Sequence, residues 1–217
     1  IQNYSATRAG LLLAPGGMVM MLFFPLAGRI TDIIPAHIPI AVGLLIFAIG
    51  FFLIQAVDVN TTFFALVIYT AITKVGLSLT IPSLSVAALR AVPPEKLARA
   101  ASSSTFFRNL GGGIGITILT AFFQHRTQLH AEALTDTQTW ANQTTREMLE
   151  GVRHLLAGTG LTDTTQMAGA IDFLSHVVQA QASTFGFKDT FWAIAIMAFL
   201  AVGPAWMIGY GGRRKRF

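Results

Sequence analysis

Five long apolar segments constrain this 217-residue chain more than any other feature of its sequence. About 20 consecutive apolar residues cross the hydrocarbon core of a bilayer as an α-helix. Segments of this kind occupy residues 6–27, 38–57, 62–89, 98–124 and 191–210. Charged residues make up only 12% of the chain, against about 25% in soluble domains. The sequence therefore predicts an all-α integral membrane protein with five transmembrane helices.

The basic residues between these segments are distributed unevenly. They are Arg29 in the first break, Arg90, Lys96 and Arg99 in or beside the third break, and residues 213–216 after the last segment. With five spans, all these regions fall on one side of the membrane. The positive-inside rule predicts that this side is cytoplasmic. The C-terminus is then cytoplasmic, and the chain begins on the outer side. Because it opens on Ile1 without a signal-peptide pattern, we expect it to be part of a longer protein.

The stretch between the fourth and fifth segments has a different composition. Apolar residues recur there at helical spacing in two runs, near 148–156 and 167–178, with Gly158 and Gly160 between them. We expect an amphipathic helical hairpin on the outer face. It is either a connector that covers the bundle or a docking surface for a partner. The predicted order is four transmembrane helices in 1–124, an extracytoplasmic helical loop in 125–188, the last transmembrane helix in 189–212 and a basic cytoplasmic tail in 213–217.

A charge and a group of glycines interrupt the fourth apolar segment. Arg108 and Asn109 fall near its middle, and Gly111, Gly112 and Gly115 follow directly. An arginine at membrane depth usually faces a bundle interior or a water-filled cavity. Small residues at this spacing let another helix approach closely. The segment indicates a helix that lines a polar path. The structural alternative is an arginine that binds helix-end carbonyls or extends to the membrane surface.

The third segment carries the second intramembrane cation, Lys74. Hydroxyl side chains, including Thr70 and Ser78, are frequent around it, and Pro82 removes a backbone donor and should bend the helix. This composition is typical of a cavity wall. An ion pair particular to this protein would also explain Lys74. In the first segment, Pro15 and Gly16 should kink or thin the helix.

Acidic residues are missing from the depth of every predicted span. A proton-coupled transporter needs a titratable group in the membrane, usually a carboxylate, so that group would lie outside this chain. If Lys74 and Arg108 stay unpaired, they would repel cationic cargo and favour anionic or neutral cargo. The chain has no Cys, and His125 and His130 have the wrong helical spacing for a metal pair. We therefore expect no metal, cofactor or catalytic set, and the basic tail lacks the aromatic residues of a nucleic-acid interface.

Three groups of motifs resemble a known family. They are Tyr4-Ser5-Ala6 with Ala9-Gly10-Leu11 and Ala14-Pro15, then Gly28-Arg29 and Asp32, and then the series from Pro93-Pro94-Glu95 to Phe107-Arg108-Asn109-Leu110-Gly111. In this order they resemble the drug:proton antiporters of the major facilitator superfamily, of the fourteen-span EmrB/QacA type. The resemblance covers essentially the whole chain. It implies spans ten to fourteen of a multidrug efflux protein that works by alternating access in a bacterial inner membrane.

The resemblance also assigns roles. Gly28, Arg29 and Asp32 would form a cytoplasmic loop that gates adjacent helices, with Gly28 in a tight turn and the charged side chains binding helix ends or each other. A simple positive-inside anchor is the alternative. The implied partners are an amphipathic small molecule, protons, the bilayer, and a periplasmic membrane-fusion adaptor with an outer-membrane channel. Two other functions stay open: export of one metabolite or siderophore, and a membrane assembly subunit that transports nothing.

Overall fold

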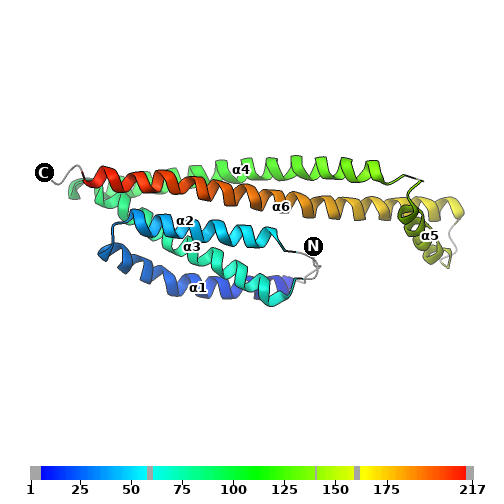
Figure 1. The fold of residues 1–217 in the computed structure, drawn as a ribbon, viewed down its shortest axis with the longest axis horizontal. Coiled ribbons are helices and arrows are strands. Elements are labelled where there is room, and N and C mark those ends of the chain that lie inside the picture. The colour runs from blue at the N-terminus through cyan, green and yellow to red at the C-terminus, as the bar shows by residue number, and fades with distance from the viewer. Residues whose placement is uncertain (1–5, 58–60, 140, 159–161, 214–217) are drawn as a thin grey trace. The chain divides into compact units, whose positions relative to one another are not determined.

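The computed structural model describes residues 6–57, 61–139, 141–158 and 162–213 (Figure 1). These residues form six α-helices and one short 3-10 helix, η1, and no strand occurs among them. The elements are α1 (Ala6–Ile33), α2 (His37–Gln55), α3 (Phe63–Arg90), η1 (Pro94–Lys96), α4 (Leu97–Thr137), α5 (Gln143–Ala157) and α6 (Asp163–Arg213). Five of the described helices are long and apolar enough to cross a membrane. The predicted all-α membrane fold is confirmed.

The chain divides into two compact units. The bundle unit contains α1, α2, α3, the part of α4 up to Ile118 and the part of α6 from Thr190 onward. The hairpin unit contains Leu119–Asp189, that is, the rest of α4, all of α5 and the first part of α6.

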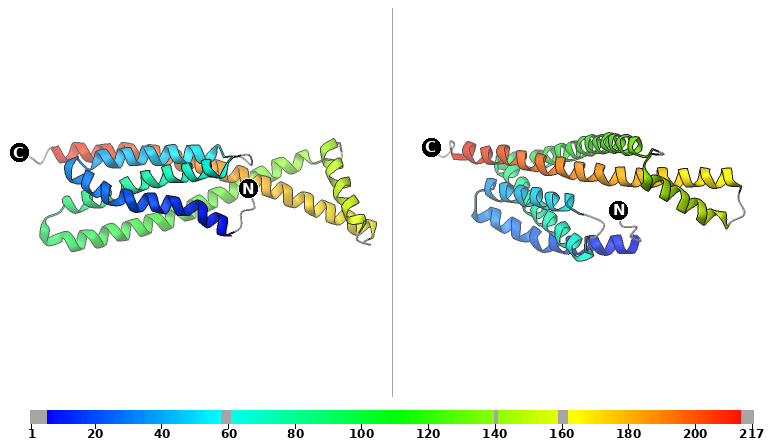
Figure 2. Two further views of the ribbon diagram at one scale, coloured as in Figure 1. Left: turned by 90° about the horizontal axis from the view of Figure 1, so that it is seen from below. Right: turned by 45° about the vertical axis from the view of Figure 1, so that its right-hand side comes forward.

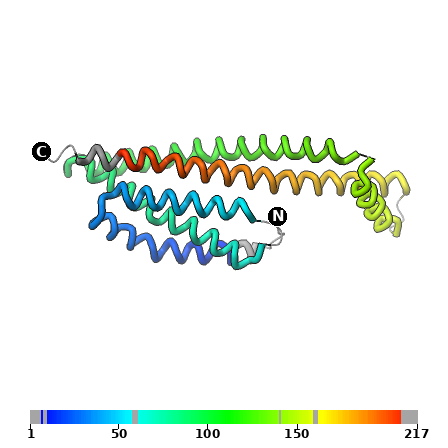
Figure 3. Tube along the Cα trace, in the orientation of Figure 1, coloured from blue at the N-terminus to red at the C-terminus, as the bar shows by residue number. Residues whose placement is uncertain are grey.

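Small residues bring α2 and α3 of the bundle unit into backbone contact. A Cβ atom built on Gly76 would lie 2.5 Å from the Phe47 backbone nitrogen and 2.6 Å from the Gly43 carbonyl oxygen. One built on Gly50 would lie 2.9 Å from the Thr73 nitrogen. From Gly43 to Gly50 along α2, the contacts move back from Gly76 to Thr73 along α3, so the two helices run antiparallel and side by side (Figures 2 and 3). Such close approach is characteristic of helix pairs in membranes.

The α1 helix runs parallel to α3 and touches it at two levels. At the first level, Gly16 lies against Lys74 and Thr70. At the second level, the hydroxyls of Thr31 and Ser83 share a hydrogen bond of 2.8 Å, and both residues are fully buried. The order of these contacts along both helices sets the parallel direction.

Aromatic contacts place the end of α6 along α2. The rings of His37 and Trp206 lie 5.7 Å apart, and those of Phe51 and Phe191 lie 5.8 Å apart. The two helices are therefore antiparallel, and the end of α6 lies beside the start of α2. Because α3 leads through a short link into α4, every helix end that carries a predicted basic region lies at the same end of the bundle unit.

The hairpin unit differs from the prediction in the extent of its helices. The α4 helix continues to Thr137, beyond the expected end at residue 124, and the second apolar run and the last span form one helix, α6. No Gly or Pro occurs in 124–137, so nothing in that polar segment ends the helix. The α5 helix forms as expected, with Asn142 accepting a hydrogen bond from the Thr144 backbone nitrogen at its start. Of the predicted break at 158–160, Gly158 caps the end of α5 and the other two residues lie outside the described residues, as does the predicted tail after Arg213.

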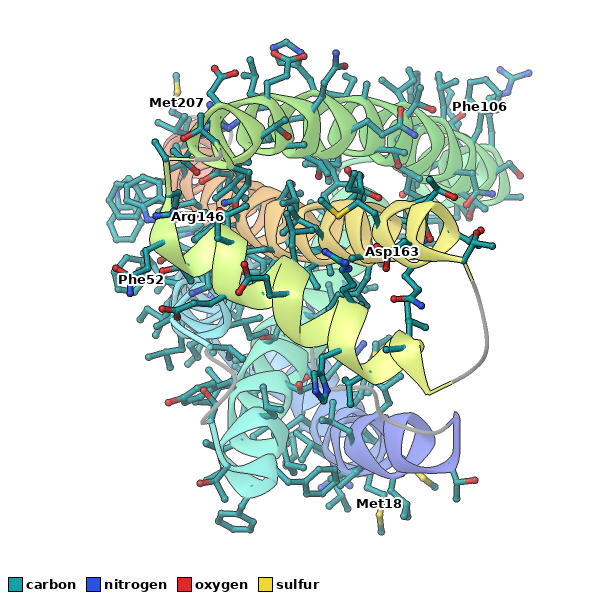
Figure 4. The ribbon with its side chains drawn as sticks, turned by 90° about the vertical axis from the view of Figure 1, so that its right-hand side faces the viewer. Met18, Phe52, Phe106, Arg146, Asp163 and Met207 are labelled. Carbon is teal, nitrogen blue, oxygen red and sulfur yellow. The ribbon has the colours of Figure 1, made fainter. Side chains whose placement is uncertain are left out.

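Large apolar side chains cover the outside of the bundle unit. Met18 on α1 is 69% exposed and Phe106 on α4 is 62% exposed, and both point away from the ribbon (Figure 4). In water such a surface would be unfavourable, whereas in lipid it is the expected one.

Candidate functional site

Lys74 lies near the middle of α3 and is half-buried. It comes eleven residues after Phe63, about 16 Å along the helix. A Cβ atom built on Gly16 would lie 3.1 Å from Lys74 Cγ and 3.8 Å from its Cε. The aliphatic part of the lysine therefore lies along α1 where Gly16 has no side chain. Among the described residues, the Lys74 ammonium makes no ion pair or hydrogen bond.

The hydroxyl groups near Lys74 are engaged by their own helix. Thr70 Oγ1 donates to the Leu66 carbonyl at 2.8 Å, and its methyl group shares the Gly16 contact with Lys74. Ser78 is fully buried and donates to the Val75 carbonyl at 2.8 Å. Thr70 is thus the predicted hydroxyl residue that the structure brings to Lys74, while Ser78 lies inside the packed helices.

Arg108 and Asn109 lie on an open face of α4. Arg108 follows Leu97 by eleven residues, again about 16 Å along its helix, and its side chain is exposed without an ion pair in the described chain. A hollow of about 440 Å³ begins at Asn109 and runs along this helix. Its lining is Asn109, Leu110, Gly113, Ile114, Thr117 and Ile118.

The glycines beside Arg108 contribute to the same open face. A Cβ atom on Gly111, Gly112 or Gly115 would meet nothing within 4 Å among the described residues. The predicted close helix contact at these glycines is therefore not made by the described residues. This contrasts with Gly43 and Gly76, which the sequence analysis did not select and which do bring two backbones together.

The predicted gate motif is helical, contrary to the expected loop. Gly28, Arg29 and Asp32 all lie in the last two turns of α1, which continues to Ile33. The helix ends there because Pro35 follows, and a proline disfavours helical geometry in the residue before it. Gly28 therefore makes no tight turn, and a Cβ atom there would meet open space.

Arg90, at the end of α3, is the partner of Asp32. Its Nη2 atom donates to Asp32 Oδ1 at 2.8 Å, and its Nη1 atom donates to the Thr31 carbonyl, also at 2.8 Å. A cation placed at the C-terminal end of a helix is favourable because the carbonyl dipoles point toward it. Arg29 is exposed and joins no ion pair within the described residues. Arg90 was predicted only as a basic residue in the third break, and its partner is visible only in the structure.

A second group of charges joins α4 to α6 in the hairpin unit. Asp189 Oδ2 lies 2.6 Å from Arg126 Nε and 2.7 Å from His130 Nε2. The His130 ring lies 5.4 Å from that of Phe185. Arg126 and His130 are four residues apart, so they share one face of α4, and this spacing was the available signal. The sequence analysis had considered His130 only as a metal ligand.

A groove of about 520 Å³ lies in the hairpin unit beside this charge group. Its lining is Phe123, Gln124, Thr127, Gln128, Ala131, Glu132, Thr135 and Asp136 from α4, with Gln179 and Ser183 from α6. Thr127 Oγ1 is buried without a hydrogen-bond partner in the described chain and lies against Gly186. The absence of a side chain on Gly186 is what lets α6 approach α4 there.

Comparison with known proteins relates this chain to membrane transporters. A model of the Major Facilitator Superfamily matches residues 1–127. Multidrug export protein EmrB of Haemophilus influenzae is 27% identical over 202 residues, which are 92% of this chain and 38% of that protein. The EmrB protein of Escherichia coli K12 is 26% identical over 217 residues, which are 98% of this chain and 41% of that protein.

A third relative is named for resistance to another kind of compound. Fatty acid resistance protein FarB of Neisseria gonorrhoeae is 24% identical over 211 residues, which are 94% of this chain and 39% of that protein. The chain thus spans about two fifths of the length of the curated relatives it matches.

Proposed function

Because this chain belongs to the Major Facilitator Superfamily, we propose that it is part of a proton-coupled exporter of amphipathic small molecules that works by alternating access. The family resemblance predicted from the motifs is confirmed. Many transporters bind cargo near the bilayer midplane, between two halves that rock around it. The five membrane-capable helices described here would supply one side of such a site.

The observation that carries this proposal is the pair of cations at mid-helix. Lys74 and Arg108 lie about 16 Å into α3 and α4, and neither has an acidic partner among the described residues. Asp32 is the one carboxylate in the described parts of α1, α2 and α3, and Arg90 already binds it. Charges are kept at membrane depth where they line a path or meet a counter-charge during the cycle.

Arg108, Asn109, Lys74 and Thr70 are the residues that we assign to the wall of the transport path. Arg108 and Asn109 offer donors on the open face of α4, and Lys74 offers an ammonium between α3 and α1. Buried Ser78 would support the α3 backbone from inside. The proton-binding carboxylate would lie in the part of the protein outside this chain. Lys74 or Arg108 would form an ion pair with that carboxylate or bind the cargo.

The Asp32–Arg90 pair is the element that we assign to the gate. It joins the ends of two parallel helices at the end of the bundle unit where the basic regions gather. That end would be cytoplasmic in a bacterial inner membrane, by the positive-inside rule. By the count of predicted spans, residues 125–188 would face outward and would be the place for a periplasmic adaptor, which in turn would contact an outer-membrane channel.

The names of the relatives support an amphipathic cargo. EmrB is described as a multidrug export protein, and FarB as a fatty acid resistance protein. Both descriptions are consistent with a path that has apolar walls and a few polar groups. Export of one specific metabolite or siderophore is the alternative that cargo competition would reveal.

Transport by the full-length protein in proteoliposomes tests the proposal. A fluorescent amphiphile is loaded, and its movement is followed with and without an imposed pH gradient. We expect movement that is accelerated by the gradient and abolished by a proton ionophore. Movement that ignores the gradient would remove proton coupling, and no movement of any amphiphile would favour an assembly subunit.

A further inference from the structure

We propose that Lys74 binds the anionic head of the cargo, so that the exporter prefers amphipathic anions to amphipathic cations of the same size. This inference rests on the proposed export function and names the chemical class of its substrate. Two observations support it. The stem of Lys74 packs against Gly16, and the described helices around Lys74 offer it no free carboxylate.

The Lys74 side chain is positioned by its contact with α1. Gly16 is buried under the lysine, with the Cβ position 3.1 Å from Lys74 Cγ and 3.5 Å from the Thr70 methyl carbon. A methyl group at this position of α1 would force the lysine stem to shift by a few tenths of an ångström. The aliphatic stem thus rests on α1 and has less freedom than a lysine on an exposed helix, and its charged end is held near the α1–α3 contact.

The described helices around Lys74 carry few charged side chains. The charged side chains described on the three packed helices are Arg29 and Asp32 on α1 and Lys74 and Arg90 on α3. Asp32 lies at the far end of α1 and is bound by Arg90 at 2.8 Å. The described residues of these three helices therefore present Lys74 with no free carboxylate. An anion that enters beside Lys74 would supply it.

The chemistry of a lysine side chain decides which anionic groups it can bind. A lysine ammonium is a compact charge with three rotatable donors, and it lacks the fixed planar fork of arginine. It therefore accepts carboxylate, sulfonate and phosphate heads without strict geometry. Attraction between opposite charges strengthens as the local dielectric constant falls, so the same ion pair is stronger at membrane depth than in water. A cation in the same place would be repelled.

The test uses the full-length transporter in proteoliposomes and two matched probes. One is a dansyl-labelled alkyl sulfonate, which stays ionised, and the other is a dansyl-labelled alkyl trimethylammonium with the same chain. The variant Lys74→Gln removes the charge but keeps most of the stem. We expect it to lower the rate of sulfonate export at least about tenfold while export of the trimethylammonium probe is unchanged or faster.

A neighbouring pair of glycines supplies the control for the seat. Gly16→Ala should displace the lysine stem and lower sulfonate export several-fold. Gly17→Ala introduces the same methyl group where the described chain leaves open space, and it should leave export of both probes near the wild-type rate. Lys74→Arg, which keeps the charge, should retain sulfonate export.

The remaining outcomes each decide the proposal. Equal loss of both probes in Lys74→Gln would show that Lys74 answers a carboxylate of the protein, and would overturn anion selection. Unchanged sulfonate export in Lys74→Gln would also overturn it. If the wild-type protein moves neither these probes nor any other amphiphile, the export function itself fails. That result is distinguished from a failure of selectivity by the wild-type control alone.

Discussion

Asp32 and Arg90 are 58 residues apart in the chain, yet a 2.8 Å ion pair joins their side chains at the ends of α1 and α3. The same arginine also binds the Thr31 carbonyl. Below this pair, Thr31 and Ser83 share a buried hydrogen bond. The two helix ends are therefore held together by a short stack of polar contacts.

The first prediction concerns the strength of that ion pair. Its side chains are 52% and 69% exposed, so Arg90→Gln should lower the free energy of unfolding by less than about 1 kcal/mol. Transport should fall much more if the pair acts as a gate. Asp32→Asn should have the same effect, and the double variant should be no worse than either single one. Arg29→Gln is the control, because Arg29 joins no ion pair in the described residues. Additive losses in the double variant would show that the two side chains act separately.

The second prediction concerns the contact between α2 and α3. Gly76→Ala would place a methyl group 2.5 Å from the Phe47 backbone nitrogen, and forcing the helices apart should cost about 1–3 kcal/mol of stability. Gly151→Ala on α5 meets open space and should gain up to about 1 kcal/mol through helix propensity. Thermal unfolding in detergent measures both. A Gly76→Ala protein as stable as the wild type would contradict the backbone contact.

The third prediction concerns Arg108. Arg108→Ala should abolish drug resistance in cells, with normal expression and membrane insertion, because its guanidinium would line the transport path. Arg99→Ala on the same helix is the matched control, since Arg99 lies only two residues from the start of α4 and is equally exposed. Normal resistance in the Arg108→Ala strain would assign the arginine a structural role.

The fourth prediction concerns the charges of the hairpin unit. Asp189→Asn removes the negative charge shared by Arg126 and His130 and replaces one carboxylate oxygen with an amide donor. All three side chains are about one-third exposed, so the change should destabilise the protein by about 1 kcal/mol. Asp163→Asn disrupts the contact with Arg153, where Asp163 is 76% exposed, and should have almost no effect. Chemical unfolding of each variant provides the comparison. Equal stability of the two variants would show that the Asp189 contacts contribute nothing.

The apolar lengths predicted the membrane helices, because crossing a bilayer requires a fixed number of apolar residues. The ends of the helices were harder to predict. The polar segment after Phe123 stays helical because it lacks Gly and Pro, whereas the prediction ended the helix where the apolar run ends. The gate motif was misplaced for a related reason, since Pro35 and not Gly28 ends α1.

The candidate site was predictable only in part. Mid-helix cations are visible in a sequence, so Lys74 and Arg108 could be selected directly. Pairings across the fold are not visible in this way. Asp32 contacts Arg90, and Gly16 contacts Lys74, only because α1 and α3 pack side by side. Neither pair has a short sequence spacing that would predict the contact.

The backbone contact between Gly43 and Gly76 also limits where ions could leak through the bundle. A membrane protein that moves cargo must keep protons and ions from escaping along its helix boundaries. With the backbones of α2 and α3 in direct contact there, no layer of side chains separates them and no water file fits between them. At this level of the bundle, an aqueous route would have to follow helix faces other than the α2–α3 contact.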